Sequence, residues 1–202
     1  MAAFGVDDLA AAKSVAVDVY TSAYRVSGQV RTRFARVAEI LNQLTSTHLP
    51  IENATISEYG HAAAAAAAPQ SLVALNEILL MVATGIQGDP RPDMKVPKRG
   101  VRAQLALPPF MLSGTVHVPQ GSRPADGLLN LVDQFVAMTD VTIASGAYPE
   151  LERAVAAVAL RRDRVHVLMV SDDERPDELL ADVLDERTAE GWLRAAGEES
   201  GR

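Results

Sequence analysis

The sequence VAVDVYTSAYRVSGQVRT at residues 15–32 aligns without a gap on VRAQLALPPFMLSGTVHV at residues 101–118, at an offset of 86 residues. Further matches follow in the same order, separated by small length changes where loops are expected: Ile40-Leu41-Asn42 faces Leu128-Leu129-Asn130, Thr55-Ile56 faces Thr142-Ile143, and Leu80-Met81-Val82 faces Leu168-Met169-Val170. Each match is short, but a shared order of matches is typical of an internal duplication. The sequence therefore predicts one unit of roughly 70 residues written twice.

Each copy is predicted to begin with two strands. Val15, Val17 and Val19 alternate with other residues, which is typical of a half-buried strand. The second strand continues this alternation and contains Gly28 in the first copy and Gly114 in the second. Glycine inside a strand indicates a bulge or a close approach of another backbone.

The rest of each copy is predicted to hold a helix, a third strand and a closing hairpin. Apolar residues at i, i+3, i+4 and i+7 predict the helix, and alternation with turn residues predicts the strands. The predicted ranges are helices at 37–44 and 128–135, third strands at 51–57 and 139–145, and closing hairpins at 72–82 and 155–170. The alanine-rich residues 61–69 are expected to form a short helix or a loose loop.

The fold class predicted from this order is α+β, mainly β. It comprises two tandem β-β-α-β-β-β copies, each a small curved sheet or partly open barrel capped by its helix, and a C-terminal helical tail. The predicted boundaries are 13–83 for the first copy, 84–100 for a Pro- and Gly-containing linker, 101–170 for the second copy and 171–202 for the tail. Because exposed sheet edges invite association, the copies are expected to pack together or to share a sheet edge.

The net charge of −7 lies in the tail. Residues 1–170 hold 15 acidic and 15 basic side chains, whereas residues 171–202 hold 11 acidic and 4 basic ones. A neutral body with an acidic tail does not attract a phosphate backbone, so nucleic-acid binding is disfavoured. The chain shows no apolar run of membrane-spanning length, no secretory signal and no cysteine. We therefore expect a cytoplasmic protein, and the excess of Arg over Lys suggests a GC-rich bacterial origin.

Few residues are candidates for chemistry. The sequence contains no phosphate-binding loop, dinucleotide-binding motif or nucleophile elbow. His117 and His166 are predicted on strands of the second copy, where they could approach each other across a sheet. Solvent-facing histidines are the preferred interpretation, and no metal site or cofactor is predicted.

Two arginines are the other ligand-binding candidates. Arg36 and Arg123 open the predicted helices, each followed three residues later by an acidic residue, Glu39 or Asp126. A helix N-terminus with an Arg can bind an anion, but an ion pair within the helix is the preferred interpretation. Asn42 and Asn130 lie beside the apolar stripe of the helices, where a buried amide is expected to bond to a strand backbone. Like Gly28 and Gly114, they are predicted to be structural.

The pattern G-x-V, then Arg with an acidic residue three later, then Leu-Asn, resembles an uncharacterised bacterial family of small β-domains that occur singly or doubled. The second copy carries it as Gly114-Thr115-Val116, Arg123, Asp126 and Leu129-Asn130; the first copy lacks the loop Pro and Gly, and Gly127 is inserted in the second. The resemblance covers both copies but not the tail, and implies a fold without an activity. The layout is also distantly similar to Sm-type and PilZ-type small barrels, although the PilZ arginine motif is absent.

Three functions follow as hypotheses. The first is a non-enzymatic scaffold, regulatory or assembly module that binds a protein partner or forms a homo-oligomer. The second is a sensor of a small anionic ligand or nucleotide, bound between the copies through Arg36 and Arg123. The third is an Sm-like RNA-binding protein, which the charge balance disfavours.

Overall fold

The computed structural model describes residues 12–61, 65–85, 98–122 and 133–170. We refer to the described residues up to Gly85 as the first half and to those from Lys98 onward as the second half. The first half contains β1 (Lys13–Tyr20), β2 (Tyr24–Thr32), α2 (Val37–Asn42), β3 (His48–Glu58), β4 (Ala66–Ala74), the 3-10 turn η1 (Leu75–Glu77) and β5 (Leu80–Thr84). The second half contains β6 (Lys98–Leu107), β7 (Phe110–Pro119), β8 (Phe135–Ala144), η3 (Pro149–Leu151), β9 (Arg153–Arg161), η4 (Arg162–Arg164) and β10 (Val167–Val170).

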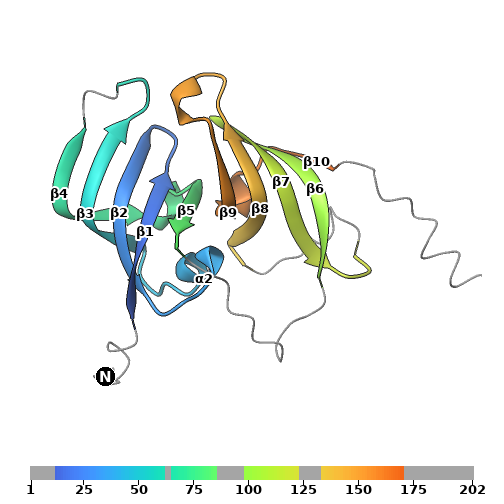
Figure 1. The fold of residues 1–202 in the computed structure, drawn as a ribbon, viewed down its shortest axis with the longest axis horizontal. Coiled ribbons are helices and arrows are strands. Elements are labelled where there is room, and N and C mark those ends of the chain that lie inside the picture. The colour runs from blue at the N-terminus through green and yellow to red at the C-terminus, as the bar shows by residue number, and fades with distance from the viewer. Residues whose placement is uncertain (1–11, 62–64, 86–97, 123–132, 171–202) are drawn as a thin grey trace, which may run out of the picture. The chain divides into compact units, whose positions relative to one another are not determined.

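All ten strands belong to one open antiparallel sheet (Figure 1). Their order is β10-β6-β7-β8-β9-β5-β1-β2-β3-β4. The two halves thus share a sheet edge, where β5 pairs with β9. The mainly β part of the predicted class is confirmed, but its α+β part is not supported, because α2 is the one α-helix among the described residues.

The sheet separates two hydrophobic cores, and each core draws on both halves. One core is built mainly from the second half and also contains Leu80 and Val82 of β5. The other is built mainly from the first half and also contains Phe135 and Ala159. Successive side chains on a strand point to opposite faces, so β5 and β9 are covered on both faces where they meet.

The closing hairpins predicted at residues 72–82 and 155–170 are wrong. β5 does not pair with β4 but crosses to β1, where Leu80 lies opposite Tyr20. β10 likewise pairs with β6 and not with β9, with Val167 opposite Ala106. The 3-10 turns η1 and η4 redirect the chain away from the strand it has just left, and the unpaired edge of β1 or β6 supplies the missing backbone partners.

The alanine-rich segment also differs from the expected helix or loop. Ala66 to Ala68 pair with β3 as part of β4. Pro69 disfavours a helix across this segment, and its missing N–H is tolerated because β4 lies at an edge of the described sheet. Pairing with β3 therefore overrides the helix propensity of alanine.

Three other boundaries change. Phe135, predicted on a helix, is the first residue of β8, and the preceding residues of that predicted helix are not described. Lys98 to Gly100, assigned to the linker, belong to β6 because they pair with β7. The predictions for Arg123, Asn130 and the tail at 171–202 fall outside the described residues.

Candidate functional site at the junction of the halves

The junction between β5 and β9 is the candidate site, because it joins residues that lie about 80 positions apart in the chain. Its register places Leu80 opposite Leu160, Met81 opposite Ala159 and Val82 opposite Val158. All six side chains are buried. One further hydrogen bond runs from the Arg161 backbone N–H to the Leu79 carbonyl at 2.8 Å.

Helix α2 of the first half covers this junction and packs against β5, β8 and β9 (Figure 1). Its buried face consists of Val37, Ile40 and Leu41. At its end, the Asn42 amide donates to the Phe135 carbonyl at 2.8 Å and accepts from the Phe135 N–H at 2.9 Å. The half-buried Asn42 therefore makes the kind of contact with a strand backbone expected for it, and the strand belongs to the other half.

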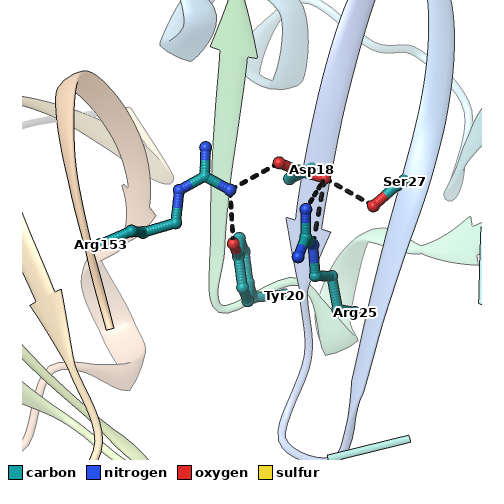
Figure 2. Close-up of polar contacts among 5 residues, drawn as sticks. All are labelled: Asp18, Tyr20, Arg25, Ser27 and Arg153. Carbon is teal, nitrogen blue, oxygen red and sulfur yellow. Dashed lines mark hydrogen bonds and ion pairs between the residues drawn. The ribbon is translucent and has the colours of Figure 1, made fainter. Parts of the chain in front are cut away.

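A polar cluster crosses the junction on β1, β2 and β9 (Figure 2). Asp18 accepts hydrogen bonds through Oδ1 from Ser27 at 2.5 Å and from Arg25, whose Nη2 lies 2.9 Å away. Its Oδ2 accepts from Nη1 of Arg153 at 2.7 Å, and the same Nη1 lies 3.0 Å from the Tyr20 hydroxyl. Arg153 thus reaches from the second half to two residues of the first.

The surroundings of the Asp18 carboxyl and the Tyr20 hydroxyl shift the pKa values of these two groups. Burial disfavours the Asp18 carboxylate, but the hydrogen bonds from Ser27, Arg153 and Arg25 outweigh that effect and hold its pKa below the usual value. Burial raises the pKa of the Tyr20 hydroxyl, against the opposing influence of Arg153. With one carboxylate between two guanidinium groups, the cluster carries an excess positive charge.

Aromatic side chains from both halves also pack together across the junction. The Phe110 ring meets Tyr20 and Tyr59 edge-on, with centroids 5.6 and 5.8 Å apart. The Tyr59 hydroxyl lies within 2.9 Å of the backbone carbonyls of Thr21 and Tyr24. Burial raises the pKa of Tyr59 strongly. Such edge-on pairs add specific geometry to the buried apolar area.

Arg161 forms a third link across the junction. Its guanidinium is 9% exposed and makes two contacts with Asp163, the shorter at 2.7 Å. A third hydrogen bond runs from Nη1 to the carbonyl of Leu75 in the first half at 2.6 Å. The hydrogen bonds from Arg161 lower the pKa of Asp163. Three of the five N–H donors of this buried guanidinium therefore form hydrogen bonds, two with Asp163 and one with the Leu75 carbonyl.

His117 and His166 lie apart in the structure. The half-buried His117 lies on β7 opposite Gly100, and its Nε2 is 2.9 Å from the Thr139 hydroxyl. The exposed His166 precedes β10, and its N–H bonds to the carbonyl of Ala106. Gly100 and Ala106 lie six positions apart on one strand, about 20 Å at the usual rise per residue. The two histidines therefore do not approach each other, and the exposed His166 agrees with the solvent-facing position preferred from the sequence.

Arg36 lies at the start of α2, where its guanidinium pairs with Glu39 at 3.4 Å. This is the intrahelical contact preferred from the sequence. Gly28 and Gly114 each lie at an irregularity of register, between Ser27 and Gln29 on β2 and between Ser113 and Thr115 on β7. These two irregularities are the bulges that a glycine inside each strand indicated in the sequence.

The Asp18 cluster was missed by sequence reasoning. Asp18 stands between Val17 and Val19 at a position that strand alternation assigns to the solvent face, and Arg153 lies 135 residues away. No local spacing connects the two. The one signal in the sequence was an acidic residue within the valine-rich run at residues 15–19.

A pH-dependent loss of stability is predicted from Asp18. Asp18→Asn is expected to lower the free energy of unfolding at pH 7 by about 1–2 kcal/mol, since it removes the carboxylate from a partly buried ion pair. Because the pKa of Asp18 is lower in the folded state, its stabilisation is present above the unfolded value and is lost as pH falls through the folded pKa. Urea unfolding of both proteins should show the difference shrinking below about pH 4.

The matched control for this measurement is Glu58→Gln, which replaces an exposed carboxyl on β3. It should change the free energy of unfolding by less than about 0.5 kcal/mol. A difference between wild type and Asp18→Asn that stays constant from pH 7 to pH 2.5 would contradict the assigned role of the carboxylate.

Among the described residues, no group of three or more His, Cys, Asp or Glu side chains is placed to hold a metal ion. None of the helices in this part of the chain combines the length and the apolar character needed to cross a membrane. No family model, curated protein or solved structure matches the chain.

Proposed function

We propose that the chain is a tandem duplication acting as a non-enzymatic, cytoplasmic assembly module. The pairing pattern supports the duplication. In the first half the order is β5-β1-β2-β3-β4, and in the second it is β10-β6-β7-β8-β9, so each strand keeps its place.

Finer features recur at matching positions. Both irregularities of register surround a glycine, Gly28 or Gly114. Both third strands contain one residue of positive φ, Asn53 at 49° and Asp140 at 52°, and Asn and Asp tolerate this conformation better than most residues. Both fourth strands end in a 3-10 turn, η1 or η4. Independent features rarely coincide in this order by chance.

The strand registers also shift the sequence alignment of the two copies by one residue near its C-terminal end. Leu80 lies opposite Tyr20, and Val167 lies opposite Ala106. Since Tyr20 and Ala106 correspond at the offset of 86 residues, Leu80 corresponds to Val167 and not to Leu168. By the same rule the counterpart of His166 is Leu79.

The assembly function is proposed on the basis of exposed apolar side chains on the two outer strands. Within the described residues, β4 and β10 each have a neighbour on one side alone. Three of the five large exposed hydrophobic side chains lie on them, namely Leu72, Val167 and Met169. An edge strand with exposed apolar residues is a template for pairing with another chain.

The test is the mass of the purified protein in solution. Size-exclusion chromatography with light scattering from about 1 to 100 µM is expected to give masses that rise above the 21.5 kDa of one chain. Association through edges should persist in 0.5 M salt, because it depends on backbone hydrogen bonds and apolar contacts and not on charge.

Binding of a small anion or nucleotide between the halves is the second candidate, favoured by the excess positive charge at Arg25 and Arg153 beside Asp18. A protein that stays at 21.5 kDa throughout, and whose melting temperature rises with a nucleotide in wild type but not in Arg153→Gln, would overturn the assembly module in favour of this second function.

A further inference from the structure

We propose that copies of this chain join head to tail, with β4 of one molecule pairing antiparallel with β10 of the next. This inference rests on the proposed assembly function and names its contact surface. The intermolecular contact would repeat the junction that β5 and β9 form within one molecule.

The places of the strands identify the two surfaces as complementary. β4 and β9 are the fourth strands of their halves, each lying beyond the third strand. β5 and β10 are the fifth strands, each lying beyond the first. The internal junction joins a fifth strand to a fourth strand. The unpaired edges that remain in the described sheet are again one fourth strand and one fifth strand.

The side chains of β10 match those that β5 buries. Leu80 and Val82 of β5 enter the core of the other half and are 0% and 5% exposed. Their counterparts on β10 are Val167 and Met169, which are 50% and 42% exposed. Between them, Leu168 packs against the core of its own half, as Met81 does in the first half. β10 thus presents outward the two apolar positions that the internal junction covers.

β4 likewise exposes a position whose counterpart on β9 is buried at the internal junction. Ala159 of β9 faces the core of the other half and is fully buried. Its counterpart by strand register is Leu72, which is 64% exposed. The adjacent Val73 is buried in the core of its own half, as Leu160 is. Leu72 is therefore exposed at the position where the internal junction buries an alanine.

Transferring the internal register fixes the intermolecular one. It places Val73 opposite Val167, Leu72 opposite Leu168 and Ser71 opposite Met169 of the next molecule. The backbone bond from Arg161 to Leu79 becomes one from the Ala74 N–H to the His166 carbonyl. An interface between different surfaces of identical chains propagates until it closes into a ring or continues as a filament.

Several polar contacts of the internal junction are not repeated in the predicted contact. The positions of Asp18, Arg153 and Arg161 are occupied by Gln104, Ala66 and Ala74. The contact between molecules therefore lacks the ion pair and the buried guanidinium. We expect it to be weaker than the internal junction and to depend on protein concentration.

Variants that block one edge at a time test whether β4 of one molecule pairs with β10 of the next. A lysine at an exposed edge position disfavours pairing with another strand, so Leu72→Lys and Met169→Lys should each raise the concentration needed for association about tenfold or more. Each variant retains the surface that the other lacks. Mixing them should therefore restore a complex, and that complex should stop at two chains.

Met111→Lys is the matched control, since Met111 is 41% exposed but lies on β7 inside the sheet. It should associate like wild type. Thermal unfolding of each variant checks that it is folded. If wild type associates but both edge variants associate as well as Met111→Lys, or if the mixture of edge variants stays monomeric, the head-to-tail contact is overturned while the assembly function stands. If wild type itself never associates, the proposed function has failed.

Cysteine pairs test the register without blocking an edge. The chain contains no cysteine, and residues directly opposite in an antiparallel pair lie within disulfide reach. The double variant Ser71→Cys, Met169→Cys should form a ladder of covalent oligomers under oxidation. In the control Gln70→Cys, Met169→Cys, one side chain points to the other face of the sheet, so its ladder should be weaker by about tenfold. Equal ladders from both pairs would overturn the register.

Discussion

Gly28→Ala is expected to lower the free energy of unfolding by about 2–3 kcal/mol, and Gly114→Ala by a similar amount. A Cβ at residue 28 would lie 2.5 Å from Cγ2 of Ile51 and 2.7 Å from the carbonyl oxygen of Glu52. At residue 114 it would lie 2.8 and 3.0 Å from the carbonyl oxygens of Thr139 and Asp140. Carbonyl groups in a paired strand cannot rotate away as a side chain can. The bulge must therefore shift, and the core beneath it with it.

The measurement is thermal or urea unfolding of the single variants. A loss of this size corresponds to a fall in melting temperature of about 4–12 °C for a domain of this length. Gly146→Ala is the control, because a Cβ at Gly146 has no neighbour within 4 Å and its φ is not in the left-handed region. Its effect should stay within about 1 kcal/mol and can be stabilising. Three variants of equal stability would contradict the steric role of the two bulge glycines.

Arg161→Ala is expected to lower the free energy of unfolding by about 2–4 kcal/mol. The substitution removes three side-chain hydrogen bonds, among them the shorter of the two that the Leu75 carbonyl accepts; the other, from the Ile78 N–H at 3.3 Å, remains. Asp163 is about half exposed and can be rehydrated, so the loss is smaller than for a pair that is buried throughout. Arg161→Lys should recover little of the stability, because an ammonium group cannot replace a guanidinium that contacts two separate acceptors.

Arg164→Ala provides the comparison, since Arg164 is exposed in the 3-10 turn η4 that follows Arg161. It should change the free energy of unfolding by less than about 0.5 kcal/mol. Urea unfolding at pH 7 measures all three variants. If Arg161→Ala were no less stable than Arg164→Ala, Arg161 would not be holding the two halves together.

The local part of the fold could be predicted from the sequence. The alternation at Val15, Val17 and Val19 gave the correct strand because the pattern itself creates the buried face. The glycines inside β2 and β7 indicated bulges because their neighbours leave no room for a Cβ. In both cases the cause of the structure lies within a few residues of the signal.

The non-local part could not be predicted. The partners of β5 are β1 and β9, from 60 to 80 positions away, and a short turn before β5 suggested a hairpin instead. The alanine run became a strand because β3 offered an edge, which no alanine signals. Asp18 and Arg153 meet through the same long-range pairing. A single sequence contains no record of which edge will be available.

The position of α2 has a consequence for how the chain can be divided. Its apolar face rests on Phe135 and Ala159 of the second half, and Met81 in the strand beside it lies in the same core. A fragment ending near residue 97 would leave this face and the whole edge of β5 in water. The converse fragment would lose Leu80 and Val82 from the centre of its core. We therefore expect neither half to fold on its own, so truncation, domain exchange or separate expression of the halves should yield insoluble material.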